Sequence, residues 1–73
     1  MTPRQHQILK FVNEYITKNR HSPSYKQIQE GCHINSYNSV SQCVNSLDRR
    51  GYITKVPYAK RSLRVTEQGR NEI

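Results

Sequence analysis

One stretch of this 73-residue chain, residues 24–53, constrains its fold more than any other. It reads SYKQIQEGCHINSYNSVSQCVNSLDRRGYI. The spacing of its apolar residues predicts two short helices with a tight break at residues 31–35, then a glycine and the start of a strand. The second helix opens with uncharged polar side chains. This order is typical of a helix-turn-helix, in which the front of the second helix touches base edges and its back is built into a core.

Capping signals place the helices. Thr2, followed by Pro3 and Gln5, predicts a first helix over about residues 3–19. Ser24 and Gln27 repeat the capping-box pattern and predict a second helix over about residues 25–32, in which Gly31 is expected to weaken the helix and let it end. Apolar stripes with a spacing of three to four residues predict the buried faces of the first and third helices: Ile8, Leu9, Phe11, Val12, Tyr15, Ile16, Val40, Cys43, Val44 and Leu47.

The third helix is expected over about residues 37–50, with Gly51 in the place of a C-cap glycine. The period then changes, and residues 52–56 and 62–66 look like two strands joined by a basic, aromatic turn. A short helix can start at Thr66. The expected fold is therefore mainly α with a small β-hairpin, a winged helix-turn-helix in a single domain, with the wing over about residues 52–66.

The composition of the chain indicates which class of partner it binds and where it is located. Twelve Lys and Arg residues against five Asp and Glu give a formal charge of +7, which favours a polyanion such as nucleic acid. No apolar run approaches the roughly 20 residues of a membrane span and no signal-peptide pattern is present, so a cytoplasmic location without a membrane partner is expected.

Catalysis and metal binding are not expected. Cys32 and Cys43 lack the spacing of zinc ligands and are predicted to be buried, reduced thiols. The histidines His6, His21 and His33 are scattered without a paired acid, so no enzyme, cofactor or metal site is predicted.

The ordered series of residues resembles the N-terminal DNA-binding domain of LexA-type repressors over about residues 2–65. The resemblance is carried by Thr2-x-Arg4-Gln5, the stripe of Ile8, Phe11 and Ile16, Ser22-Pro23-Ser24, Ile28, Ser36-x-Asn38-Ser39, Leu47, Arg49-Arg50-Gly51-Tyr52-Ile53 and Arg61-Ser62-Leu63-Arg64. It implies that the front of the third helix enters the major groove and that the wing touches the DNA backbone. The base-facing residues carried over by position are Ser36, Asn38, Ser39, Ser41 and Gln42.

Two departures from that family matter. The family usually has an acidic pair where this chain has Ser41 and Gln42, so a different operator is expected. The family also carries a C-terminal self-cleaving and dimerising domain, which nothing after Ile73 supplies. The expectation is either a fragment or a stand-alone domain of the kind that a phage or mobile element encodes.

The chemistry of the third helix supports base reading. Asn38 and Gln42 are one turn apart and share a face, and both amides can bond adenine N6 and N7. Ser36 is either a base contact or the N-cap, and Tyr37 packs either on a sugar or thymine methyl or against the core. Arg49 and Arg50 are interpreted as helix-end partners. The predicted backbone contacts are Arg4, Lys26, Asn45, Lys55, Tyr58, Lys60, Arg61 and Arg64.

The leading functional prediction is a sequence-specific binder of double-stranded DNA, a small transcriptional repressor. The main alternative is a winged-helix protein-interaction module, for example a mobile-element-encoded inhibitor of a host complex. Shape-selective binding of an unusual duplex is a third reading. A homodimer on DNA stays open, because one recognition helix reads only a few base pairs.

Overall fold

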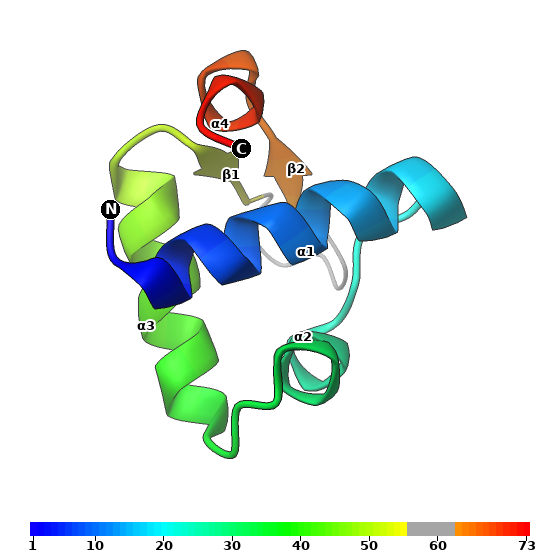
Figure 1. Ribbon diagram of the computed structural model, residues 1–73, viewed down its shortest axis with the longest axis vertical. Coiled ribbons are helices and arrows are strands. Elements are labelled where there is room, and N and C mark those ends of the chain that lie inside the picture. Colours follow the sequence, from blue (N-terminus) through cyan, green and yellow to red (C-terminus); the bar gives the residue numbers. More distant parts are fainter. Residues whose placement is uncertain (56–62) are drawn as a thin grey trace.

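Three capped helices, a short antiparallel hairpin and a fourth helix follow one another along the chain (Figure 1). The computed structural model describes residues 1–55 and 63–73. The elements are α1 (Pro3–Asn19), α2 (Tyr25–Cys32), α3 (Tyr37–Arg49), β1 (Ile53–Thr54), β2 (Arg64–Val65) and α4 (Glu67–Asn71). The hairpin pairs Ile53 with Val65. This order confirms the predicted winged helix-turn-helix.

Both expected capping boxes are formed. Thr2 Oγ1 accepts a hydrogen bond from the Gln5 backbone N–H at 3.1 Å, and Gln5 Oε1 accepts from the Thr2 N–H at 3.3 Å. Ser24 and Gln27 make the same reciprocal pair at 3.1 and 2.8 Å. Each box satisfies two backbone donors that a helix start would otherwise leave open, which fixes where α1 and α2 begin.

Gly31 has a different role from the one expected. The residue that ends α2 is His33, whose left-handed backbone (φ 56°) forms the C-cap. A Cβ atom on Gly31 would lie 2.1 Å from Cε2 of Phe11, far inside van der Waals contact. Gly31 therefore lets α2 approach α1 closely at the Phe11 ring.

The end of α3 sets the direction of the hairpin. The helix stops at Arg49, one residue earlier than expected, and Gly51 takes the left-handed conformation (φ +83°). The Gly51 N–H donates to the carbonyl of Asp48 at 3.1 Å, and the Tyr52 N–H donates to that of Leu47 at 2.9 Å. This is the Schellman pattern, which turns the chain out of α3 and directly into β1.

The strands are shorter than the sequence indicated. Each has two residues. The turn after α3 and the start of α4 limit their outer ends, and Lys55 and Leu63 already lie outside the strands at their inner ends. The ladder is extended by one backbone hydrogen bond, from the Thr66 N–H to the Tyr52 carbonyl at 3.1 Å. The expected tip of the wing, residues 56–62, lies outside the described residues.

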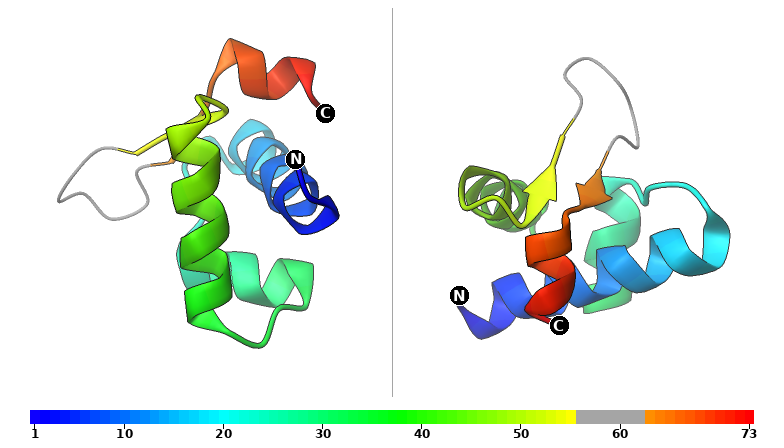
Figure 2. Two further views of the ribbon diagram at one scale, coloured as in Figure 1. Left: turned by 90° about the vertical axis from the view of Figure 1, so that its left-hand side faces the viewer. Right: turned by 90° about the horizontal axis from the view of Figure 1, so that it is seen from above.

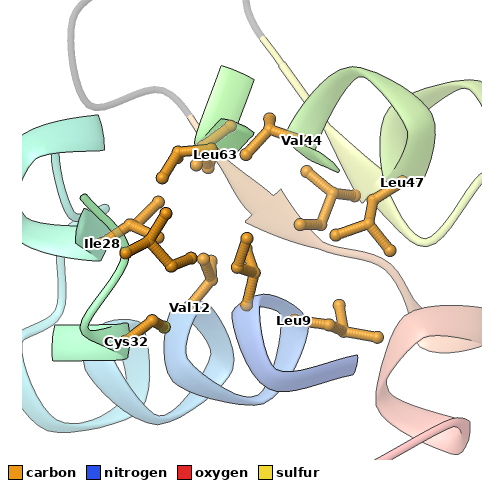
Figure 3. Close-up of a cluster of buried hydrophobic side chains, with 11 residues drawn as sticks. Leu9, Val12, Ile28, Cys32, Val44, Leu47 and Leu63 are labelled. Atoms are coloured by element: carbon orange, nitrogen blue, oxygen red, sulfur yellow. The ribbon is translucent and has the colours of Figure 1, made fainter. Parts of the chain in front are cut away.

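One core joins the three helices and the hairpin (Figure 3). Leu9 and Val12 from α1, Ile28 and Cys32 from α2, and Val44 and Leu47 from α3 point toward one another, with Leu63 above them. The full set of buried apolar residues is Ile8, Leu9, Val12, Ile28, Cys32, Ile34, Val40, Val44, Leu47, Ile53 and Leu63. Because α3 contributes Val40, Val44 and Leu47, its back is fixed and its opposite face is turned outward.

A buried serine links the loop between α1 and α2 to the hairpin. Ser22 is only 5% exposed, and its hydroxyl donates to the Pro23 carbonyl at 3.1 Å. The same oxygen accepts from the backbone N–H of Leu63, at 3.0 Å, 41 residues along the chain. The hydroxyl therefore holds the start of β2 against the helices.

Replacing Ser22 with alanine is expected to lower the free energy of unfolding by about 1–3 kcal/mol, because the buried Leu63 N–H loses its acceptor. Urea denaturation followed by circular dichroism measures this. The matched control is Thr17→Ala, which removes an exposed hydroxyl bonded only within α1 and should change stability by less than about 0.5 kcal/mol. Equal losses in the two variants would contradict the role given to Ser22.

The C-terminal helix α4 covers one edge of the hairpin (Figure 1). Its N-cap, Thr66, donates from Oγ1 to the Gly51 carbonyl at 2.7 Å and accepts from the Gly69 N–H at 3.0 Å. A Cβ atom on Gly69 would lie 2.2 Å from the Tyr52 carbonyl oxygen, so this contact requires glycine. No helix within residues 1–55 or 63–73 has the length and hydropathy of a membrane span.

Candidate nucleic-acid interface

The outward face of α3 carries a stripe of polar side chains. The helix itself faces the viewer in the left panel of Figure 2. Asn38, Gln42, Asn45 and Arg49 are all exposed. At about 100° per residue they fall within an arc of about 60°, opposite the buried face of the helix. We call these four residues the α3 stripe.

The three predicted serine contacts lie at the start and flanks of the α3 stripe. Ser36 is the N-cap, and its Oγ accepts from the Ser39 N–H at 3.3 Å. The hydroxyl proton of Ser36 remains available as a donor, so capping and ligand binding are compatible at this residue. Ser39 and Ser41 are half-buried and fall on opposite flanks of the helix. The amides therefore occupy the centre of the face and the smaller hydroxyls its edges.

The N-terminal turn of α1 lies beside one flank of α3. Gln5 Nε2 donates to Ser46 Oγ at 3.1 Å, which ties the two helices together. A shallow hollow between them is lined by Thr2, Arg4, Gln5, Ser39, Gln42 and Cys43. Arg4, a predicted backbone contact, thus lines the same hollow as Gln42.

The two thiols are held in their neutral forms. Cys32 is buried and Cys43 is half-buried, and both are free. Burial raises the pKa of each thiol, and the nearby positive charge of Arg4 only partly offsets that rise. Both cysteines therefore stay protonated at neutral pH and act as apolar packing groups.

The hairpin approaches the other flank of α3. Lys55, directly after β1, donates from Nζ to Oδ1 of Asn45. This bond uses Oδ1 of Asn45 as its acceptor and holds the Lys55 ammonium beside the α3 stripe. Arg64 is exposed on β2, opposite Thr54 in the ladder.

A third cationic group, Lys26, lies near the first turn of α3. With Asn35 and Tyr37 it lines a hollow between α2 and α3. Tyr37 is 57% exposed and is absent from the buried core, although it lies against a residue that packs on that core. Its ring packs against that of Tyr25, with centroids 5.4 Å apart at 46°. Burial raises the pKa of Tyr25, with smaller contributions from Tyr37 and Asp48, so this phenol stays neutral.

The described chain thus brings most predicted contacts onto and around one helix. Arg4, Lys26 and Lys55 surround the polar face of α3, and the first turn of α3 contains no acidic residue. The free N–H groups at the start of a helix add to this positive potential. The predicted contacts Tyr58, Lys60 and Arg61 lie outside the described residues.

Arg49 is the last residue of α3 and its last-turn cation, in keeping with the helix-end role expected of it. It is also exposed and lies in line with the α3 stripe, a placement that the sequence analysis did not predict. The spacing in the sequence could have predicted this placement. Arg49 follows Asn38 by 11 residues, which is about three helical turns, so the two residues share a face of the helix. The bonds from Gln5 to Ser46 and from Lys55 to Asn45 were also missed, since each joins segments whose pairing depends on the folded arrangement.

Comparison with known proteins gives one consistent family. The model of the LexA DNA-binding domain matches residues 1–62. The LexA repressor of Syntrophobacter fumaroxidans is 40% identical over 53 residues, 73% of this chain and 26% of that protein. Those of Anaeromyxobacter sp. Fw109-5 and Finegoldia magna are 34% and 31% identical, over 96% and 100% of this chain.

These alignments cover only part of each relative. The chain spans 30% of the Anaeromyxobacter protein and 37% of the Finegoldia protein, so the likeness concerns one domain of those repressors. Within the chain, the family model covers α1, α2, α3 and β1, which are the elements that build and support the α3 stripe. By this match and by its winged helix-turn-helix fold, the chain belongs to the LexA DNA-binding domain family.

Proposed function

We propose that this chain binds double-stranded DNA sequence-specifically, with α3 in the major groove, and acts in transcriptional regulation as a repressor. The observation that supports this most is the α3 stripe, an exposed row of three amides and one arginine on a helix whose back is fixed in the core. The relatives with the same domain are named LexA repressors. A DNA partner also fits the cytoplasmic location expected from the sequence.

Recognition of the base edges is assigned to the side chains in the N-terminal half of α3. Asn38 and Gln42 each offer a carbonyl and an NH₂ group, which match the N6 donor and N7 acceptor of adenine. The hydroxyl groups of Ser36, Ser39 and Ser41 are assigned hydrogen bonds to neighbouring bases. Because none of these groups is charged, they discriminate by hydrogen-bond pattern instead of by net attraction.

Affinity for DNA is assigned to the cations in and around the α3 stripe. Arg4 and Lys26 beside α3, Lys55 at its hairpin flank and Arg49 at its far end are assigned to phosphates. The NH₂ group of Asn45 and the exposed Arg64 join them, and the hairpin residues Tyr58, Lys60 and Arg61 remain predicted backbone contacts. Each phosphate neutralised releases counterions, so binding should weaken steeply with salt.

Two copies on one operator complete the proposal. One α3 reads only a few base pairs, and helix-turn-helix proteins reach high specificity by placing two recognition helices on half-sites about one helical turn apart. The acidic pair usual in the family is replaced by Ser41 and Gln42, so the half-site should differ from that of the relatives.

Replacing Arg4 with glutamine should weaken binding to every duplex by about fivefold near 150 mM salt and reduce the salt slope by about one. The physical reason is the loss of one phosphate contact without any loss of base reading. Fluorescence anisotropy over a salt series, on a selected and a random duplex, measures both quantities.

Lys18→Gln is the matched control for this experiment. Lys18 is an exposed lysine in the last turn of α1, whereas Arg4 is in the first turn beside α3 (Figure 1). The control should leave the salt slope close to that of the parent. If both variants weaken binding alike, the effect is one of net charge, and the assignment of Arg4 to a phosphate is wrong.

A further inference from the structure

Tyr37 is an aromatic ring in the first turn of α3, on the flank of the α3 stripe that faces α2. At 57% exposure it is the most exposed of the large hydrophobic residues in residues 1–55 and 63–73, ahead of Ile73 and Met1. It is the first residue of α3, between the N-cap Ser36 and Asn38 of the α3 stripe. Single exposed apolar residues are common on protein surfaces, so the contacts of this one decide what it can do.

The ring of Tyr37 is held in place by a second ring. Tyr25 packs against it with centroids 5.4 Å apart. Tyr25 is itself half-buried, packs against the hydrophobic core, and is the first residue of α2 after the Ser24 capping box. The Tyr37 ring is therefore supported on one side by the fold, while more than half of the side chain is exposed to solvent. Such a side chain loses little conformational freedom when a ligand covers it, which favours binding.

The position of Tyr37 specifies the kind of contact. The N-terminal residues of a recognition helix are the ones that touch base edges. In the major groove the main apolar feature is the C5-methyl group of thymine, which is read by apolar side-chain atoms. The neighbouring Asn38 is assigned to adenine, so A·T pairs, and with them thymine methyl groups, are expected at this end of the helix.

We infer that Tyr37, supported by Tyr25, is a specificity-determining residue that packs on the C5-methyl group of a thymine next to the base read by Asn38. This rests on the proposed function, since it needs α3 in the major groove. The contact uses the exposed part of the ring, and the hydroxyl group is not required.

The test removes the methyl group from the DNA. Each thymine of the selected site is replaced in turn by deoxyuridine, which keeps every hydrogen-bonding group. One replacement near the Asn38 contact should weaken binding about three- to fivefold. This is the change in affinity that corresponds to the free energy of burying one methyl-sized group. Tyr37→Ala should bind the thymine and deoxyuridine sites equally, while Tyr37→Phe should keep the parent ratio. Thermal melts and circular dichroism verify that each variant is folded at the binding temperature.

The outcomes separate this inference from the proposed function. A protein that selects a sequence but shows no deoxyuridine effect at any thymine overturns the Tyr37 assignment and leaves the DNA-binding function standing. A deoxyuridine effect that persists in Tyr37→Ala, or is lost in Tyr37→Phe, also overturns it, because another group or the hydroxyl would then make the contact. A protein that selects no sequence at all overturns the proposed function itself.

Discussion

Leu47→Ala is expected to lower the free energy of unfolding by about 2–5 kcal/mol, the usual range for truncating a buried leucine. Leu47 is fully buried and joins α3 to the side chains of α1 and the hairpin (Figure 3). The free energy of unfolding of a protein is about 0.05–0.15 kcal/mol per residue, so a domain of 73 residues has a total of roughly 4–11 kcal/mol. The loss is therefore a large share of the stability, and a measurable unfolded fraction is expected.

Urea denaturation of the variant and of Ile73→Ala measures this loss. Ile73 is also aliphatic but 42% exposed, so its truncation should change the free energy of unfolding by less than about 0.5 kcal/mol. DNA affinity of Leu47→Ala should fall only in proportion to the unfolded fraction. A small, equal effect in both variants would contradict the core described for α3.

Asn38→Ala has the largest effect expected on recognition. It should cost about 1–3 kcal/mol of binding free energy on the preferred duplex and little on random DNA, because only base reading is removed. Asn38 is exposed and at the start of the α3 stripe, so stability should change little. Competition anisotropy at about 150 mM salt, where non-specific attraction is screened, separates the two affinities.

Asn71→Ala is the matched control for Asn38→Ala. It removes the same amide from an exposed helical position, on α4 and away from α3. It should leave both affinities unchanged. If Asn38→Ala weakens all duplexes by the same factor, Asn38 contacts the DNA backbone and the reading assignment fails.

The sequence predicted the fold well where the deciding interactions are local. Thr2 with Gln5 and Ser24 with Gln27 satisfy each other within one turn, so their capping boxes are visible in the sequence and are formed in the structure. Gly51 likewise acts within the turn that it closes. These signals, with the apolar stripes, were sufficient to place the three helices and the hairpin.

What the sequence did not predict depends on contacts between distant segments. Gly31 is needed because the ring of Phe11, 20 residues earlier, packs against it. The hydroxyl group of Ser22 is needed because it accepts a hydrogen bond from the backbone of Leu63. The sequence named Arg4 and Lys55 as backbone contacts, but it did not show what places them beside α3. Arg4 and Lys55 reach it only because α1 and the hairpin pack on its two flanks.

The central claim is that α3 reads a DNA sequence, and selection from a random duplex library at about 150 mM salt tests it most directly. The predicted result is an enriched sequence motif that contains adenines. In a second selection with the Asn38→Ala variant, the base position with the strongest preference should lose that preference. A palindromic motif would add that two copies bind together. Retention of duplexes without enrichment of any sequence by the folded protein would contradict the claim.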